Sequence, residues 1–290
     1  MKRPIVRLSS LQLTNIKNVK NGTIYMPNTV NKILSADKAE ILGIYGQNGS
    51  GKTAIVDALY FLQKVMVGAD LDQSLEDYMT IDSDTAEIFA DFNIFMDGIV
   101  FEIGYTLSLS REEKEIVINR ETLRAAKNEN GIRTNKTTFM DYQRDQADAI
   151  FKPQKRLDEI LEANKEIKTD LIVARKMAEK SNCSYIFGES SREIFCREYK
   201  NGFQQFSVII SSLFEFALKD LFVIRNTHSG VISANFVLPM AFRIENDNIG
   251  AKGDFAVPLT EPILVDEERK NLLETIVEQI NIVLYTIIPG

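Results

Sequence analysis

Alternating apolar and polar positions predict a β-hairpin in the first 25 residues. Apolar side chains recur at every second or third position between Leu8 and Ile16, and the alternation resumes at residues 23–25. Between them lies Asn21-Gly22, a pair that readily supplies the positive φ angles of a tight turn. We therefore expect two antiparallel strands joined at Asn21-Gly22.

A short apolar run follows at residues 41–45, ILGIY, and predicts a buried strand. It leads into a glycine-rich stretch, and after Lys52 apolar residues recur at helical spacing as far as Met66. Strand, glycine loop and helix are thus expected in that order.

Residues 86–110 and 115–123 alternate like antiparallel strands, and Asp97-Gly98 is a strong hairpin turn between two of them. From about residue 139 to residue 182 the chain becomes charged and helix-favouring, with Pro153 near a helix start. Beyond it the pattern predicts short strands at 184–188 and 193–199, then a helix at 203–222. Extended segments at 236–244 and 255–265, a loop at 245–254 and a terminal helix from 266 complete the prediction.

The order of these elements predicts an α/β fold, in which a P-loop sheet continues into an antiparallel β-subdomain and carries a helical insertion. We assign the P-loop lobe with its β-subdomain to residues 1–138 and the helical insertion to residues 139–230. We assign residues 231–290 to a return segment with the terminal helix.

Composition excludes several classes of protein. Because His228 is the single histidine, a multi-histidine metal site is excluded. Cys183 and Cys196 are too far apart for a C-x-x-C pair, so we interpret them as buried or incidental thiols. A net charge of −7 gives no support to a general polyanion-binding surface, so nucleic acid stays an open question.

No apolar run approaches the ~20 residues of a membrane span, and the first residues are too polar for a signal peptide. We expect a cytoplasmic protein without a membrane partner.

The chemistry centres on residues 46–53, GQNGSGKT, which fit the phosphate-loop pattern G-x-x-x-x-G-K-[ST]. In such a loop, backbone N–H groups and the positive end of the following helix bind phosphate, the lysine reaches the β- and γ-phosphates, and the hydroxyl ligates Mg²⁺. The alternative is a chance match in a glycine-rich turn, but the strand and helix signals on either side favour the loop. ATP and Mg²⁺ are therefore the predicted ligands, with Thr53 on the metal. The predicted contacts are Gly46, Gln47, Asn48, Gly49, Ser50, Gly51, Lys52 and Thr53.

The stretches GQNGSGKTAIVDAL and TNIKNV resemble the ABC-class ATPase heads of the SMC and RecF group. More narrowly, they are similar to the compact stand-alone ATPases, often labelled AAA family, of bacterial anti-phage and abortive-infection systems. The similarity is specific over residues 7–66 and diffuse to about residue 125. It implies that ATP is buried between two subunits, hence a homodimer or a partner subunit, and that the ATPase drives an effector protein. It also implies a head that continues past residue 290, so that residues 231–290 would be an incomplete C-terminal lobe. It also implies a basic residue near the nucleotide; Lys17 is the candidate, although Lys17 and Lys20 can equally be ordinary surface lysines.

Hydrolysis in the resembled class needs an LSGGQ-like signature and an apolar strand that ends in Asp-Glu. No signature-like segment occurs in the sequence, and the only candidate for the acidic pair is Asp266-Glu267. We favour the alternative that Asp266 caps the terminal helix and Glu267 lies in its first turn. His228 precedes this pair and receives no role. Gln143 could contact Mg²⁺, but a solvated surface glutamine is the preferred interpretation.

Two main functions remain at this point. The chain is either the nucleotide-dependent ATPase component of a bacterial defence or DNA-maintenance system, or a nucleotide-binding module without turnover of its own. A small-molecule kinase is a weaker third possibility, because it needs an arginine-bearing lid that we do not find. The apolar positions between 272 and 287 exceed what one helix face needs, which also predicts self-association or a partner.

Overall fold

The computed structural model describes most of the chain up to residue 226 and two short strands beyond it. The described residues are 3–71, 78–112, 115–144, 146, 150–163, 165–196, 204–226, 231–235 and 255–258. The chain divides into two compact units, one of residues 1–223 with 236–252 and the other of residues 224–235 with 253–290. Every helix within the described ranges is too short or too polar to cross a bilayer.

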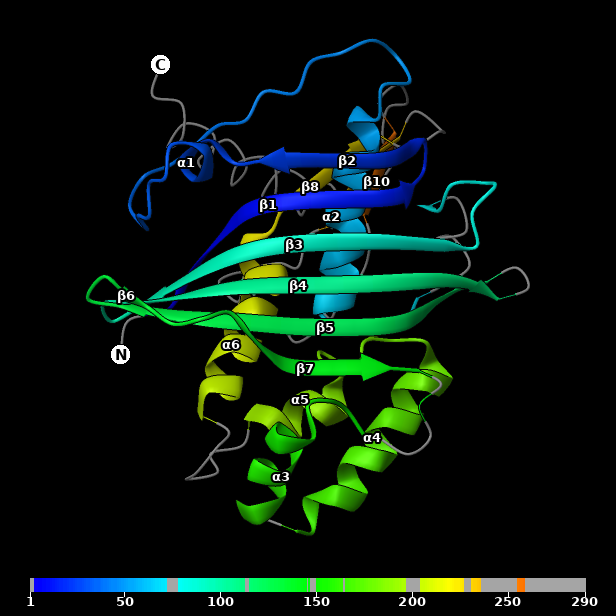
Figure 1. The fold of residues 1–290 in the computed structure, drawn as a ribbon. Coiled ribbons are helices and arrows are strands. Elements are labelled where there is room, and N and C mark those ends of the chain that lie inside the picture. Colours follow the sequence, from blue (N-terminus) through cyan, green and yellow to red (C-terminus); the bar gives the residue numbers. More distant parts are fainter. Residues whose placement is uncertain are drawn as a thin grey trace, which may run out of the picture. The chain divides into compact units, whose positions relative to one another are not determined.

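An antiparallel seven-stranded sheet dominates the first unit (Figure 1). Its order is β2-β1-β3-β4-β5-β6, and β7 also pairs with β5. The strands are β1 (Ile5–Ile16), β2 (Val19–Tyr25), β3 (Thr85–Met96), β4 (Ile99–Glu112), β5 (Glu115–Glu129), β6 (Ile132–Arg133) and β7 (Thr137–Gln143). The expected mixed α/β fold with antiparallel strands is confirmed.

The helices are α1 (Pro27–Val30), α2 (Lys52–Met66), α3 (Gln154–Ala163), α4 (Ile167–Ser181), α5 (Glu189–Cys196) and α6 (Gln204–Glu215), and a π-helical turn (Phe216–Asp220) continues α6. In Figure 1, α2 and α6 lie behind the sheet, whereas α3, α4 and α5 lie beside β7. The sheet therefore has one face covered by helices and one open face. Alternate residues of β3, such as Ile88 and Phe92, are buried on the covered face, as the period-2 pattern predicts.

Arg175 connects α4 to the end of β7. Its guanidinium donates to the carbonyl oxygens of Gln143 (3.0 Å), Arg144 (2.6 Å) and Gln146 (2.6 Å), and it forms an ion pair with Glu179 at 2.9 Å. The side chain is 9% exposed. A planar, permanently charged group with several donors is suited to gathering such carbonyls at the end of a strand.

One predicted turn is confirmed and the other is wrong. Asp97 and Gly98, with φ of 45° and 82°, join β3 to β4 as expected. Asn21 and Gly22 instead lie inside β2, opposite Thr14 and Leu13. The turn falls at residues 17–18, because contacts with residues 78–80 hold the chain there and the resulting register keeps Leu11 and Leu13 on the covered face.

The predicted strands at 184–188 and 193–199 are also wrong. Residues 185–187 form turns and most of the second stretch belongs to α5. The backbone N–H groups of Tyr185 and Ile186 donate to the carboxylate of Glu121 instead of a strand ladder, and the Ser184 hydroxyl accepts from the N–H of Phe187. A buried side chain thus supplies the acceptors that a neighbouring strand would have supplied. Residues 139–143, expected to begin the helical region, form part of β7 because β5 offers them a free edge.

The predicted strand at residues 41–45 is absent. The segment has no regular secondary structure and pairs with none of the described strands, and Ile41 and Tyr45 are 90% and 94% exposed. Without a neighbouring strand its backbone groups gain no ladder hydrogen bonds, which is why its high β-propensity is not sufficient.

The second unit contains short strands in the order β10-β9-β8, namely β8 (Val223–Asn226), β9 (Val231–Asn235) and β10 (Phe255–Pro258). β9 and β10 are antiparallel. β10 confirms the first part of the predicted extended segment 255–265. The predicted segment 236–244, the loop 245–254 and the terminal helix lie outside the described residues.

Candidate phosphate-binding site

The residues that match the phosphate-loop pattern follow the irregular segment 41–45 and end with Lys52 and Thr53, the first two residues of α2. Residues 46–50 are exposed and Gly51 is buried. Gly49 and Gly51 have φ of 83° and 88°, in the left-handed region that glycine adopts without the steric cost of a Cβ. The two glycines therefore let the chain reverse and enter the helix at Lys52.

The loop delivers its residues to the N-terminal end of α2. Thr53 is the second residue of this helix and its side chain is exposed. The first N–H groups of a helix have no partner within the helix, and the aligned peptide dipoles make this end positive. An anion can be bound at such an end by backbone donors alone.

Lys52 connects the two ends of the loop. Its Nζ donates to the carbonyl oxygens of Gly46 and Gln47, both at 2.6 Å, and lies 3.4 Å from the Oγ of Ser50. The ammonium is thus held over the loop rather than extended into solvent. Loop backbone, helix end and one ammonium are brought together, as the pattern predicts.

The β1–β2 turn lies against the same loop, which the sequence did not indicate. The side-chain amide of Asn18 donates to the carbonyl oxygen of Gly49. Val19 packs on Gly51 so closely that a Cβ on this glycine would lie 2.6 Å from Val19 Cγ2. Asn18 and Val19 carry no recognisable motif, so only the fold shows that they border the loop.

Lys17, the weak sequence candidate for a nucleotide contact, forms an ion pair with Asp57 on α2. Its ammonium also lies 5.2 Å from the centre of the Tyr78 ring, within cation–π range. The Asp57 side chain is 6% exposed, so Lys17 compensates a buried carboxylate one helical turn beyond Thr53. Lys20 lies exposed on the edge strand β2.

The remaining predicted residues do not join the loop. Gln143 is exposed at the end of β7, and β3, β4 and β5 separate that strand from β1, whose turn contacts the loop. The structure thus does not bring Gln143 to the site. Asp266, Glu267 and His228 lie outside the described residues.

The two cysteines are free thiols in half-buried positions. Burial, with a smaller contribution from Asp70, raises the pKa of Cys183 to about 11, and burial also raises the pKa of Cys196. A raised pKa lowers the thiolate fraction and hence nucleophilicity. Within the described ranges no three His, Cys, Asp or Glu side chains cluster as a metal site would require.

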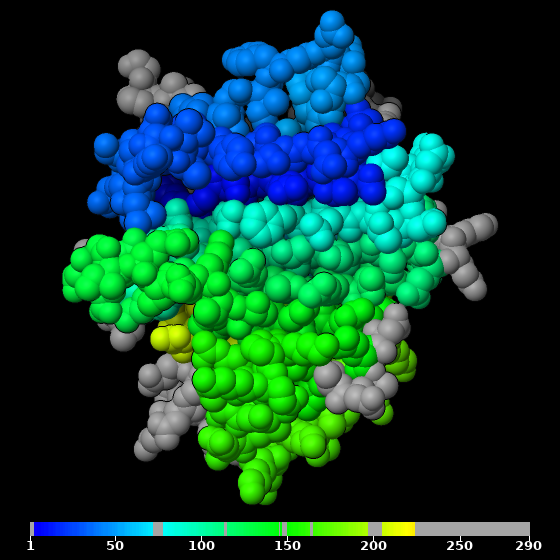
Figure 2. Space-filling model, viewed as in Figure 1, coloured from blue at the N-terminus to red at the C-terminus, as the bar shows by residue number. Residues whose placement is uncertain are grey.

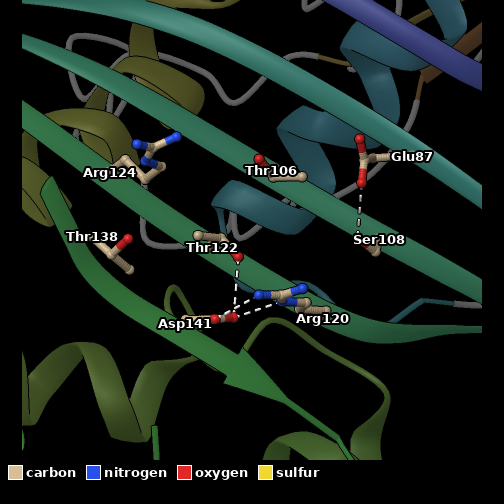
Figure 3. A pocket seen from close by; sticks show the side chains of 8 residues that line it. All are labelled: Glu87, Thr106, Ser108, Arg120, Thr122, Arg124, Thr138 and Asp141. Carbon is tan, nitrogen blue, oxygen red and sulfur yellow. Dashed lines mark hydrogen bonds and ion pairs between the residues drawn. The ribbon is translucent and has the colours of Figure 1, made fainter. Parts of the chain in front are cut away.

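A shallow hollow of about 380 Å³ lies on the open face of the sheet (Figure 3). In Figure 2 the strands themselves form the surface on this face. The hollow is lined by Glu87, Thr106, Ser108, Arg120, Thr122, Arg124, Thr138 and Asp141. Two arginines and two carboxylates give these residues a formal charge sum of zero.

Three of the hollow's four charged side chains hydrogen-bond to groups that also line it. Arg120 makes a two-pronged contact with Asp141, at 2.7 and 2.6 Å, and that hydrogen bonding raises the pKa of Arg120. The Ser108 hydroxyl donates to Glu87 at 3.3 Å. Arg124, which is exposed, also lines the hollow, and Figure 3 draws no interaction between it and the other labelled side chains.

Comparison with known families bears on residues 41–169, which match a family model described as "AAA domain, putative AbiEii toxin, Type IV TA system". The matched region contains the loop, α2, the strands from β3 to β7, all of α3 and the first residues of α4. A search of curated proteins found no match. The family match and the loop geometry together support a P-loop ATPase-type domain.

Proposed function

We propose that the chain is a Mg²⁺-dependent ATP-binding protein of the P-loop ATPase type. The observation that carries this proposal is the loop at the start of α2, where Lys52 lies over the backbone of Gly46 and Gln47. The family match over residues 41–169 supports a nucleotide-binding domain of this type independently of the loop geometry.

The residues present fit a Mg²⁺-bound triphosphate. The N–H groups of the loop and of the first turn of α2 would bind phosphate oxygens, and Lys52 would exchange its loop carbonyls for the β- and γ-phosphates. The exposed Thr53 hydroxyl would ligate Mg²⁺, which is bound by oxygen ligands and the phosphates themselves. The bound nucleotide would supply the phosphoanhydride bond whose cleavage could drive a partner.

The finer proposal is that this domain resembles an ABC-class head and serves a bacterial defence or DNA-maintenance system. It rests on the residues GQNGSGKTAIVDAL and TNIKNV and on the description of the matching family. Partners belong to the same proposal, namely a second copy or another subunit that completes the ATP site, and an effector protein. Light scattering with and without ATP tests it, because a monodisperse monomer at high concentration in both states would count against a shared site.

We further propose that the isolated chain turns ATP over negligibly, which favours a nucleotide-binding component over a self-sufficient enzyme. The sequence contains no LSGGQ-like segment, and without an acidic strand end the attacking water is not positioned. Steady turnover that Glu267→Gln abolishes would instead assign Asp266 and Glu267 to metal and water, and would contradict the capping interpretation.

The binding proposal is tested by calorimetry with ATP and Mg²⁺ on the wild type, Lys52→Ala and a control variant. Lys20→Ala is the matched control, because it removes an exposed lysine from neighbouring β2. We expect Lys52→Ala to lose measurable binding and Lys20→Ala to bind within about twofold of the wild type, since an exposed charge outside the loop contributes little. All three should have the same circular dichroism spectrum. Equal affinity in Lys52→Ala would contradict the assignment.

A further inference from the structure

The β1–β2 turn reaches the phosphate loop through two neighbouring residues. Asn18 donates its side-chain amide to the Gly49 carbonyl, and Val19 packs on the backbone of Gly51. Both contacts fall on the part of the loop that has left-handed backbone. The hairpin therefore contacts the loop at Gly49 and Gly51, whose positive φ angles are uncommon in a polypeptide chain.

The turn is itself fixed from its other side. The backbone N–H of Lys17 donates to the carbonyl oxygen of Tyr78 at 2.8 Å, and the Thr80 hydroxyl donates to the Lys17 carbonyl at 2.7 Å. Ile16 forms a bridge with Met79 next to these bonds. The position of the turn is thus set by the sheet and by residues 78–80, independently of the loop.

The exposed part of the loop has few other supports among the described residues. Within it, the N–H of Ser50 donates to the Gln47 carbonyl at 3.2 Å, and Lys52 contacts the carbonyls already described. Because a trans peptide places the carbonyl oxygen and the following N–H on opposite sides, holding the Gly49 oxygen also orients the Ser50 N–H. Asn18 thus helps to fix the Gly49–Ser50 peptide, whose N–H donates to the Gln47 carbonyl inside the loop.

We propose that the β1–β2 turn is a positioning element for the phosphate loop, and that Asn18 is its positioning residue. The inference rests on the proposed nucleotide site. The turn acts before the nucleotide arrives, by holding the loop backbone at Gly49–Ser50 and Gly51 in one conformation, which we propose is the one that binds the phosphates of a nucleoside triphosphate. Preorganised donors bind more tightly because less ordering remains to be done on binding.

The ion pair between Lys17 and Asp57 adds an electrostatic part to the same role. Asp57 lies four residues after Thr53 and hence on the same side of α2, one turn further on. An uncompensated carboxylate there would oppose anion binding at the helix end. Lys17 neutralises it, and so the turn both orients the loop and removes an unfavourable charge.

The test compares Asn18→Ala and Asn18→Gln with a control, Asn21→Ala. Asn21 lies in the same hairpin but only accepts a hydrogen bond from the exposed Thr14 hydroxyl at 3.1 Å, away from the loop. Two quantities are measured on the full chain: the affinity for a fluorescent ATP analogue with Mg²⁺, and the hydrogen exchange of the amides of residues 46–53 without nucleotide. Exchange in β4 and β5 serves as the internal reference for global stability.

For Asn18→Ala we expect about fivefold weaker binding, the magnitude that the loss of one neutral hydrogen bond produces, and faster exchange in the loop alone. Asn18→Gln keeps the donor on a longer side chain and should recover at least half of both effects, whereas Asn21→Ala should show neither. Unchanged loop exchange in Asn18→Ala would overturn the inference. If the wild type does not bind the analogue at all, the proposed function fails, while loop exchange still decides whether Asn18 positions the loop.

Discussion

Glu121 on β5 is a fully buried carboxylate, and replacing it with alanine should destabilise the fold strongly. It accepts hydrogen bonds from the hydroxyls of Tyr105 and Ser184 and from the N–H of Tyr185, each at 2.6 Å, and a weaker one from Ile186 at 3.4 Å. Glu121→Ala leaves all these donors in the core without an acceptor. The contacts join the central sheet to the segment between α4 and α5.

The magnitude follows from these contacts. Three short bonds at about 1 to 3 kcal/mol for each orphaned donor give roughly 3 to 9 kcal/mol. Removing a buried charge returns several kcal/mol, so we expect a net loss of about 3 kcal/mol in the free energy of unfolding. Glu121→Gln keeps the side-chain volume, and its amide oxygen can still accept from the two backbone N–H groups. Its NH2 group, however, is a donor that then faces the two hydroxyl donors. Its loss should be about 1 kcal/mol.

The pH dependence gives a second, independent readout. Burial raises the pKa of Glu121, opposed by its hydrogen bonds to Ser184 and Tyr105. The folded chain therefore binds this proton more tightly than the unfolded chain, whose glutamate pKa is about 4.3. The stabilisation that this tighter proton binding gives the folded state is complete below the unfolded pKa, and it is lost as the pH rises through the raised pKa of the folded state. Glu121→Gln lacks this contribution, so the advantage of the wild type over it should shrink as the pH rises.

Urea unfolding followed by circular dichroism between pH 4 and 8 measures these differences. Glu129→Ala is the control, because Glu129 lies exposed near the end of the same strand and should have little effect. A loss below about 1 kcal/mol for Glu121→Ala, or parallel pH profiles for the wild type and Glu121→Gln, would refute the reasoning.

Three further outcomes can be checked directly. Gly51→Ala should reduce ATP affinity in calorimetry by more than about tenfold, because the φ of 88° disfavours any Cβ and the new atom would lie 2.6 Å from Val19 Cγ2. Arg175→Lys should cost about 2 to 3 kcal/mol in thermal unfolding, because lysine cannot serve the same set of carbonyls and the site is almost fully buried. In a Cys196→Ser background, alkylation of Cys183 should accelerate about tenfold per pH unit up to pH 9.5 without levelling near pH 8.5, since the pKa of this thiol is raised to about 11.

Local signals in the sequence were sufficient where the structure depends on neighbours in the chain. Asp97-Gly98 needs only two residues and the flanking alternation to form its turn, and α2 needs only its own apolar spacing after Lys52. The phosphate-loop pattern likewise lies within one continuous stretch. These elements could be predicted because no distant residue has to agree with them.

The incorrect assignments depend on residues far away in the sequence. Asn21-Gly22 has turn chemistry as good as that of Asp97-Gly98, but the contacts of Lys17 with residues 78–80 place the turn earlier. The pattern of residues 184–188 predicts a strand, but in the structure the distant Glu121 supplies the acceptor for backbone N–H groups of this segment. Similarly, the contact between Asn18 and the loop joins two positions for which no pattern predicts proximity.

The pairing of β1 with β3 also has a consequence for the order of folding. Partners in this pair, such as Thr14 with Glu87 and Ile5 with Phe95, are 73 and 90 positions apart, whereas β3 and β4 meet at a two-residue turn. Because closing a long loop costs more entropy than closing a short one, we expect the β3–β4–β5 meander to form early and β1 to dock late. The phosphate loop lies within the long connection that this late step closes, so it acquires its support from residues 18 and 19 only then. A nucleotide that binds only the completed loop would therefore shift the equilibrium toward the state in which β1 is docked.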